Sequence, residues 1–140
     1  MNANAIQLIP YIHFNGDCEE ALNMYQSILG GDILVASRYD NPAMNAPKEY
    51  QQKILHASFI FGGNTIMASD TMPGKEISRG SGDTSLSLSV ANPEEGEKIF
   101  NELSKGGKVH IPFKKQFWGD WHGNFIDKFG IRWMVNTGNS

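Results

Sequence analysis

Residues 17–31 read DCEEALNMYQSILGG and residues 92–107 read NPEEGEKIFNELSKGG, and this repeated pattern decides the fold. In each stretch, apolar residues recur at helical spacing after an Asp or Asn that can cap a helix, and a glycine pair follows. Asp17 with Glu20 has the form of a capping box, while Asn92 precedes a proline that suits the first helical position. The sequence therefore predicts two similar amphipathic helices, each ended by glycine.

The two helices belong to a longer internal repeat. Glu94 follows Glu19 by 75 residues, and Gly107 follows Gly31 by 76. One strand pattern precedes each helix and three follow it, in the same order in both halves. The expected strands are residues 8–14, 32–39, 53–61 and 64–70 in the first half, and 84–90, 108–113, 121–127 and 131–136 in the second. Both halves predict the order β-α-β-β-β; the alternative is chance similarity between two amphipathic helices.

Length and composition indicate one globular domain. The chain has 140 residues, of which 40% are hydrophobic and 19% charged. We expect module one at about residues 6–70, a linker at residues 71–82 and module two at about residues 83–137. A four-stranded sheet with one helix would leave a face bare, so the halves should pack together as a single domain spanning residues 1–140.

Charge and hydropathy exclude several classes of partner. The net charge of −3 provides no electropositive field for nucleic acid. The longest apolar run, residues 33–36, is far short of the about 20 residues that a membrane span needs, so we expect no membrane contact. Residues 1–7 do not resemble a signal peptide, and the single Cys18 cannot form an internal disulfide. These features predict a cytoplasmic protein, in which Cys18 is an inert thiol.

Motifs along most of the chain carry a family resemblance. They are residues 10–14 (PYIHF), 18–21 (CEEA) with Tyr25, 29–31 (LGG), 66–70 (IMASD), 117–119 (FWG) and 127–136 (DKFGIRWMVN). In this order they resemble the PhnB-like branch of the vicinal oxygen chelate superfamily, which includes glyoxalase I, bleomycin-resistance proteins and extradiol dioxygenases. The resemblance implies an α+β fold whose two tandem β-α-β-β-β modules form a curved mixed sheet with a concave ligand cavity. It also implies a homodimer.

Many members of this branch carry the label demethylubiquinone methyltransferase, which the sequence does not support. A Rossmann-type methyltransferase needs a glycine-rich turn between a strand and a helix. Here Gly62 and Gly63 join two expected strands, and the other glycine pairs follow helices.

The resemblance also raises the question of a metal site. The superfamily's enzymes hold a divalent metal with residues on the first and last strands of each module. The corresponding positions fall near Ile9 or Pro10, within residues 66–70, near Ser85 and near Met134. Asp70 is the only carboxylate in the second of these, so at most one of four ligands is present. We therefore expect no cofactor. A non-standard metal site from His13, His56 and Asp70 is an alternative.

Strand alternation points to a binding surface in module one. Tyr11 and His13 share one face of their strand, and His56 and Ser58 share one face of theirs, opposite the apolar positions. We expect the apolar faces to lie under the helices and these four residues to line the ligand cavity, together with Ser85, Ser87 and Ser89 of the expected strand at residues 84–90. The alternative is that they face solvent or bond across strands.

A second group of candidate residues is aromatic. Trp118 and Trp121 flank Gly119 and Asp120 where an expected strand begins, and Gly123 follows them. They could stack there on a flat ligand. The alternative is that they seal the core or a contact between subunits. The preferred function is non-covalent binding of a small molecule, and whether any reaction is catalysed stays open. The alternative is a metal-dependent lyase, isomerase or dioxygenase of the same fold.

Overall fold

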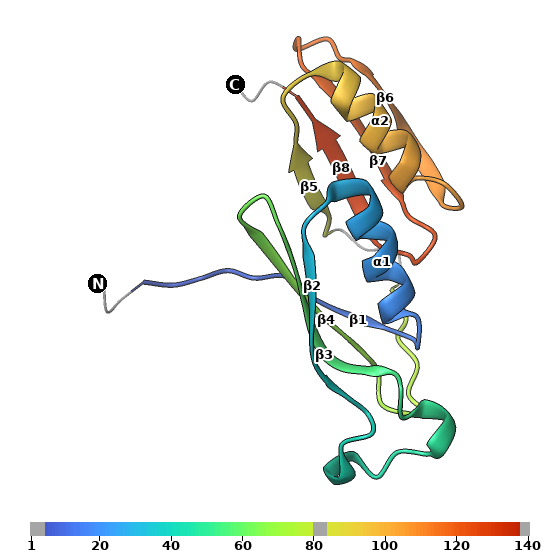
Figure 1. Cartoon of the computed structure of the whole chain (residues 1–140). Helices are drawn as coiled ribbons and strands as arrows, with labels where there is room; N and C mark the ends of the chain where they lie inside the picture. The colour runs from blue at the N-terminus through green and yellow to red at the C-terminus, as the bar shows by residue number, and fades with distance from the viewer. Residues whose placement is uncertain (1–4, 80–83, 138–140) are drawn as a thin grey trace. The chain divides into compact units, whose positions relative to one another are not determined.

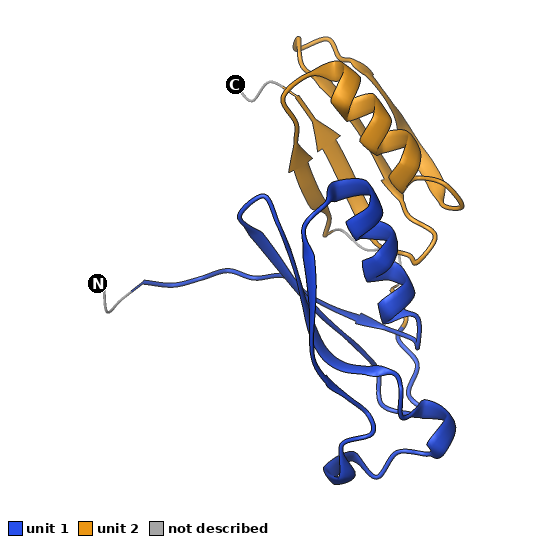
Figure 2. Cartoon of the chain, viewed as in Figure 1, with its two compact units in different colours: residues 1–77 blue, residues 78–140 orange. Residues whose placement is uncertain are grey.

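The structure is a computed structural model that describes residues 5–79 and 84–137. It divides into two compact units, residues 1–77 and 78–140 (Figure 2). The division falls inside the predicted linker, whose residues 80–82 lie outside the described part. Each unit contains one α-helix and one mixed four-stranded sheet, which confirms the predicted α+β class and the order β-α-β-β-β. A cavity shared by the modules, and their packing as one domain, stay predictions.

Unit 1 has the strand order β1-β4-β3-β2, with β1 parallel to β4 and the other pairs antiparallel (Figure 1). Its elements are β1 (Tyr11–Phe14), α1 (Cys18–Leu29), β2 (Asp32–Arg38), η1 (Pro42–Met44), η2 (Lys48–Tyr50), β3 (Ile54–Phe61) and β4 (Asn64–Asp70). The first strand begins three residues later than predicted. Pro10 has no N–H to donate, and the residues before it extend beyond the sheet.

Unit 2 repeats this topology with the order β5-β8-β7-β6, in which β5 is parallel to β8. Its elements are β5 (Leu86–Ser89), α2 (Pro93–Leu103), β6 (Lys108–Lys115), β7 (Trp121–Ile126) and β8 (Arg132–Asn136). Strand β6 runs two residues beyond the predicted end, because Lys114 and Lys115 pair with the start of β7 across a short turn. In the described part of the chain, neither helix is long and apolar enough to cross a membrane.

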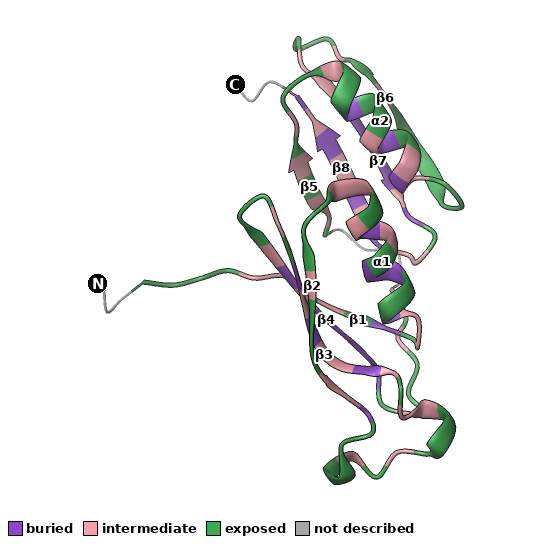
Figure 3. Ribbon diagram, in the orientation of Figure 1, coloured by how far each residue is buried: buried purple, intermediate pink, exposed green. Residues whose placement is uncertain are grey.

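Each unit buries one face of its sheet under its own helix (Figure 3). In unit 1 the buried strand residues include Phe14, Ala57 and Phe59, and α1 contributes Leu22 and Tyr25. The corresponding core of unit 2 is formed by Phe125, Trp133 and Val135 of the sheet with Phe100 and Leu103 of α2. The buried positions alternate along the strands, as expected for a sheet that is covered on one side.

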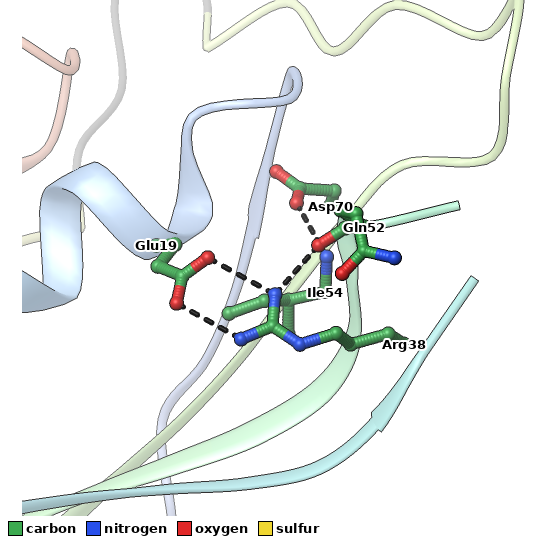
Figure 4. Close-up of polar contacts among 5 residues, drawn as sticks. All are labelled: Glu19, Arg38, Gln52, Ile54 and Asp70. Atoms are coloured by element: carbon green, nitrogen blue, oxygen red, sulfur yellow. Dashed lines mark hydrogen bonds and ion pairs between the residues drawn. The ribbon is translucent and has the colours of Figure 1, made fainter. Parts of the chain in front are cut away.

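The start of α1 corrects one sequence prediction. The side chain of Asp17 makes no capping hydrogen bond. The buried carboxylate of Asp70, at the end of β4, instead accepts hydrogen bonds from the Cys18 N–H and the Ile54 N–H, each at 2.9 Å. Figure 4 shows Asp70 with Ile54. Asp70 therefore fixes the first turn of α1 and the first residue of β3. In α2 the predicted cap is confirmed, since Asn92 Oδ1 accepts the Glu95 N–H at 2.8 Å.

A bidentate ion pair joins α1 to β2 near this carboxylate. The Arg38 guanidinium donates to Glu19 Oε1 at 3.0 Å and to Glu19 Oε2 at 2.9 Å (Figure 4). The same guanidinium donates to the carbonyl of Gln52 at 2.6 Å. Hydrogen bonding by Arg38 lowers the pKa of Glu19 below its ordinary value. The helix, the edge strand and the segment before β3 are thus held together at one end of the sheet.

The repeated glycine pairs have a steric cause. A β-carbon at Gly31 would lie 2.2 Å from the carbonyl oxygen of Ile60, and one at Gly107 would lie 2.0 Å from that of Ile126. In both units, the backbone that leaves the helix passes directly against the third strand of its sheet. Only glycine permits this approach, so the same residue type recurs 76 positions apart.

Adjacent glycines allow this steric demand to be tested. Gly30 and Gly31 both have positive φ, of 76° and 91°, but nothing lies within 4 Å of a β-carbon at Gly30. Gly30→Ala should lower the free energy of unfolding by roughly 1–3 kcal/mol, the cost of placing a side chain at φ 76° and ψ −165°, a conformation essentially restricted to glycine. Gly31→Ala should cost on the order of 3 kcal/mol or more, because it adds overpacking against backbone. Equal losses in urea unfolding would contradict this account.

Replacing the carboxylate that anchors α1 should also be costly. Asp70→Ala leaves the buried amides of Cys18 and Ile54 without this acceptor, at about 1–3 kcal/mol each, so we expect the free energy of unfolding to fall by about 2–6 kcal/mol. Asp32→Ala, at an exposed position, is the matched control and should change it by less than about 0.5 kcal/mol. Urea titrations followed by circular dichroism measure both; similar losses for the two variants would show that Asp70 is not an anchor.

Candidate functional site

The four residues predicted for module one share a sheet face. Tyr11 pairs with Met67, which in turn pairs with Ser58. His13 lies two residues after Tyr11, and His56 lies two residues before Ser58. Side chains in strands alternate between faces, so all four lie on the face away from α1. The predicted strand parity is therefore confirmed.

Three of these side chains form a cluster. The Tyr11 hydroxyl and His56 Nδ1 are 2.9 Å apart, within hydrogen-bond distance. The Tyr11 ring stacks on the His56 ring with 5.6 Å between centroids, and its centroid is 5.0 Å from that of His13. Tyr11 is 44% exposed. The cluster presents a phenol and two imidazoles on the face of unit 1 away from α1. Ser58 lies on the same face, on the far side of Met67 from Tyr11.

Asp70 does not join His13 and His56. It pairs with Phe14, which is buried under α1, and both of its carboxylate oxygens accept backbone N–H groups. Burial raises the pKa of Asp70, while the amides of Ile54, Cys18 and Gly16 oppose the rise. The structure therefore does not bring the three residues of the non-standard metal site together.

The positions inherited from the superfamily do not form a metal-binding set either. Asp70 is the one carboxylate among them, and its two oxygens accept hydrogen bonds from the backbone N–H groups of Cys18 and Ile54. Across residues 5–79 and 84–137, no three His, Cys, Asp or Glu side chains are grouped so that they could hold a metal ion. The residues present do not fit the superfamily's metal, and no chemistry is assigned to one.

Unit 2 has a polar surface at the equivalent place. Ser87 pairs with Met134, which pairs with Asn124. His122 lies two residues before Asn124 and pairs with Asn136. Ser87 thus occupies in unit 2 the place that Tyr11 has in unit 1, and His122 the place of His56. Both units carry a histidine at the same point on the face away from the helix.

A chain of hydrogen bonds joins these side chains. Asn124 Nδ2 lies 3.2 Å from His122 Nε2, and His122 Nδ1 lies 2.5 Å from Asn136 Oδ1. Asn136 Nδ2 donates to Ser87 Oγ at 2.8 Å. An amide nitrogen only donates and an amide oxygen only accepts, so His122 Nε2 is an acceptor and its proton is on Nδ1. The donors all run in one direction, from Asn124 to Ser87.

Trp118 lies beside this chain. Its ring centroid is 6.2 Å from that of His122, and the side chain is 53% exposed. The amide of Gln116 donates to the carbonyls of Lys114 and His122, at 3.1 Å each, and so closes the turn that carries Trp118. The indole is therefore held on the open side of unit 2, where it can contact a ligand.

Trp121 lies on the other face. It alternates with His122 along β7, and its ring centroid is 5.6 Å from that of Phe113, which packs near Phe100 of α2. Trp121 and His122 are adjacent in β7 and point to opposite faces, and Trp118 lies near His122. The structure therefore does not bring Trp118 and Trp121 together as one aromatic platform. Contact of either indole with a ligand stays a prediction.

Sequence reasoning did not select His122, Asn124 or Asn136. The signal that could have found them is the offset between the third strands, which is 66 residues rather than the 75 or 76 between the helices. With that offset, His56 aligns with His122 and Ser58 aligns with Asn124. The connection from the second to the third strand is shorter in unit 2, and this shifts the register of the repeat.

Comparison with known proteins places this fold in a family. A family model described as 3-demethylubiquinone-9 3-methyltransferase matches residues 6–136. Protein YjdN of Escherichia coli is 35% identical over 140 residues, covering 93% of this chain and 94% of that protein.

Solved structures agree with this match. Protein PA1353 from Pseudomonas aeruginosa is 37% identical, with a TM-score of 0.83 over 95% of this chain and 98% of that one. A PhnB protein from Bacillus cereus has a TM-score of 0.81 at 24% identity, over 95% and 100% of the two chains. A glyoxalase-related enzyme from Fulvimarina pelagi shares the fold at 16% identity, with a TM-score of 0.60 over 95% and 89%. The chain belongs to the PhnB-like family, which has the glyoxalase-like fold and whose model carries the methyltransferase description.

Proposed function

We propose that this protein binds a small molecule non-covalently on the sheet faces that lie away from its helices. The observation that carries the proposal is the duplicated polar face: each unit places a histidine at the same register position, hydrogen-bonded through Nδ1. A half-exposed tryptophan stands beside one of them. Polar groups fixed in position beside an aromatic ring are typical of ligand sites.

The chemistry of these faces favours a flat ligand with polar substituents. Trp118 and Tyr11 can stack on a ring, and imidazole and hydroxyl groups can donate or accept hydrogen bonds. In unit 1 we assign ligand contact to Tyr11, His13, His56 and Ser58. In unit 2 we assign it to Trp118, while Trp121 packs beside Phe113 on the α2 face.

Binding is proposed in preference to methyl transfer or metal-dependent chemistry. Gly62 and Gly63 occupy the turn between β3 and β4, not a strand-to-helix turn that could hold a nucleotide cofactor. The residues at the superfamily's metal positions have other partners or are not ligands. No resident cofactor is therefore part of the proposal.

A ligand screen by intrinsic tryptophan fluorescence tests the binding proposal. A ligand of wild-type protein should lose at least about fivefold in affinity in Trp118→Ala, because one stacking contact of about 1 kcal/mol is removed together with apolar area. His56→Ala tests the face of unit 1 by itself and should weaken a ligand that binds there. Unchanged affinity in both variants would show that the assigned faces do not bind it.

The control for this screen is stability. Trp118 is half-exposed, so Trp118→Ala should change the free energy of unfolding by less than about 1 kcal/mol. Trp133 is 1% exposed and donates from Nε1 to Asp127 at 2.9 Å, so Trp133→Ala should cost roughly 3–5 kcal/mol. A core-sized loss in Trp118→Ala would mean that this indole is structural.

We also propose that the protein is a cytoplasmic homodimer. Ile6 and Leu8 are 93% and 95% exposed in the segment that precedes β1, and apolar side chains of this size favour cover by a second copy. Light scattering at micromolar concentration should give twice the chain mass of 15.5 kDa. A mass of one chain would contradict the dimer.

A further inference from the structure

We infer that unit 2 carries a recognition site for a planar ring with a hydrogen-bond acceptor at one end and a donor at the opposite end. The site consists of Ser87, Met134 and Asn124, and Trp118 lies at its side. The hydrogen-bond chain through His122 and Asn136 fixes the orientation of the Ser87 and Asn124 side chains. The inference rests on the proposed function and deepens it, because it names the ligand chemistry of one of the two faces.

The first step is the direction of the hydrogen-bond chain. Because Asn136 donates to Ser87 Oγ, the serine's own proton is directed to some other acceptor. Because Asn124 donates to His122 through Nδ2, its carbonyl oxygen is left as an acceptor. Neither end has a further hydrogen-bond partner among residues 5–79 and 84–137. The chain thus presents one donor, on Ser87, and one acceptor, on Asn124.

The second step is where these two ends lie. Ser87 and Asn124 flank Met134, since each pairs with it from a neighbouring strand. Strands are about 4.8 Å apart, so the two backbones are separated by about 10 Å, roughly the span of one aromatic ring with its substituents. A ring that bridges them would lie over the thioether of Met134, which makes favourable contacts with aromatic groups.

The third step is the polarity that the ligand must have. Its acceptor has to meet Ser87 and its donor has to meet Asn124, so a para-substituted phenol with a carbonyl group fits. A carboxylate offers only acceptors and would place negative charge against an amide oxygen if it approached Asn124. Two cationic side chains on this face would favour an anion: Lys114, which pairs with His122 on the exposed edge strand, and Arg132, two residues before Met134 on β8. A simple anion is therefore the competing outcome.

The experiment uses 4-hydroxyacetophenone as the probe and the full-length protein. Binding is followed in two-dimensional ¹H–¹⁵N NMR spectra through the side-chain amides of Asn124 and Asn136 and the indole N–H of Trp118. Ser87→Ala should weaken the probe about three- to tenfold, the effect of one neutral hydrogen bond. Ser89→Ala is the matched control: it lies in the same strand and pairs with Asn136, yet it is not part of the chain, so affinity should change less than about twofold.

Two further probes test the polarity. 4-Methoxyacetophenone lacks the phenolic donor and should bind about three- to tenfold more weakly than 4-hydroxyacetophenone. Benzoate should bind more weakly than either. Equal effects of Ser87→Ala and Ser89→Ala, equal affinity for the hydroxy and methoxy probes, or tighter binding of benzoate would each overturn the inference. Thermal melts confirm that both serine variants are folded.

The failure of this inference differs from the failure of the proposed function. A ligand that shifts only the NMR signals of Tyr11, His13 and His56, and none in unit 2, would leave the proposed function standing and overturn the site in unit 2. If the screen finds no ligand and none of the three probes shifts the signals of either unit, both are overturned.

Discussion

The buried carboxylate of Asp70 is the interaction on which unit 1 depends. With one oxygen on Cys18 and the other on Ile54, it ties the end of β4 to the start of α1 and the start of β3. Tyr39 adds to this junction by donating from its hydroxyl to the Asp70 carbonyl at 2.8 Å. A charge in an apolar core is tolerated only when its lone pairs are filled, and here N–H groups from two other elements fill them. The orientation of the helix, and therefore the face that it leaves open, follows from this junction.

Unit 2 also contains a buried aspartate that accepts several N–H groups, but at a different place in the module. Asp127, in the turn between β7 and β8, accepts the N–H groups of Phe129 and Ile131 and the indole N–H of Trp133. The two modules thus share their topology and their glycine contacts but not their buried charge. Both modules have the same close approach of a glycine to the third strand. The buried aspartate, in contrast, lies at the end of β4 in unit 1 and after β7 in unit 2, in each case where N–H donors surround it.

The sequence predicted what depends on short-range periodicity. The order of the elements and the face of each strand follow from alternation, which is why the sequence predicts that Tyr11 and His56 share a face. It failed at the α1 cap, because the acceptor lies 52 residues away in Asp70 while Asp17 stands at the local position. The chain through His122 was not predicted for a related reason: it joins three strands, and only register brings Ser87, Asn136 and Asn124 within reach.

The equivalence of His56 and His122 suggests how one module could give rise to two different surfaces. The histidine keeps its place in both, but its Nδ1 meets the hydroxyl of Tyr11 directly in unit 1 and reaches that of Ser87 only through Asn136 in unit 2. The first strand thus contributes the phenol of Tyr11 to this face in unit 1 and the hydroxyl of Ser87, beside Met134, in unit 2. Since the backbone register is the same, the residue at this one first-strand position decides which hydroxyl the histidine's hydrogen bonds reach, that of Tyr11 or that of Ser87.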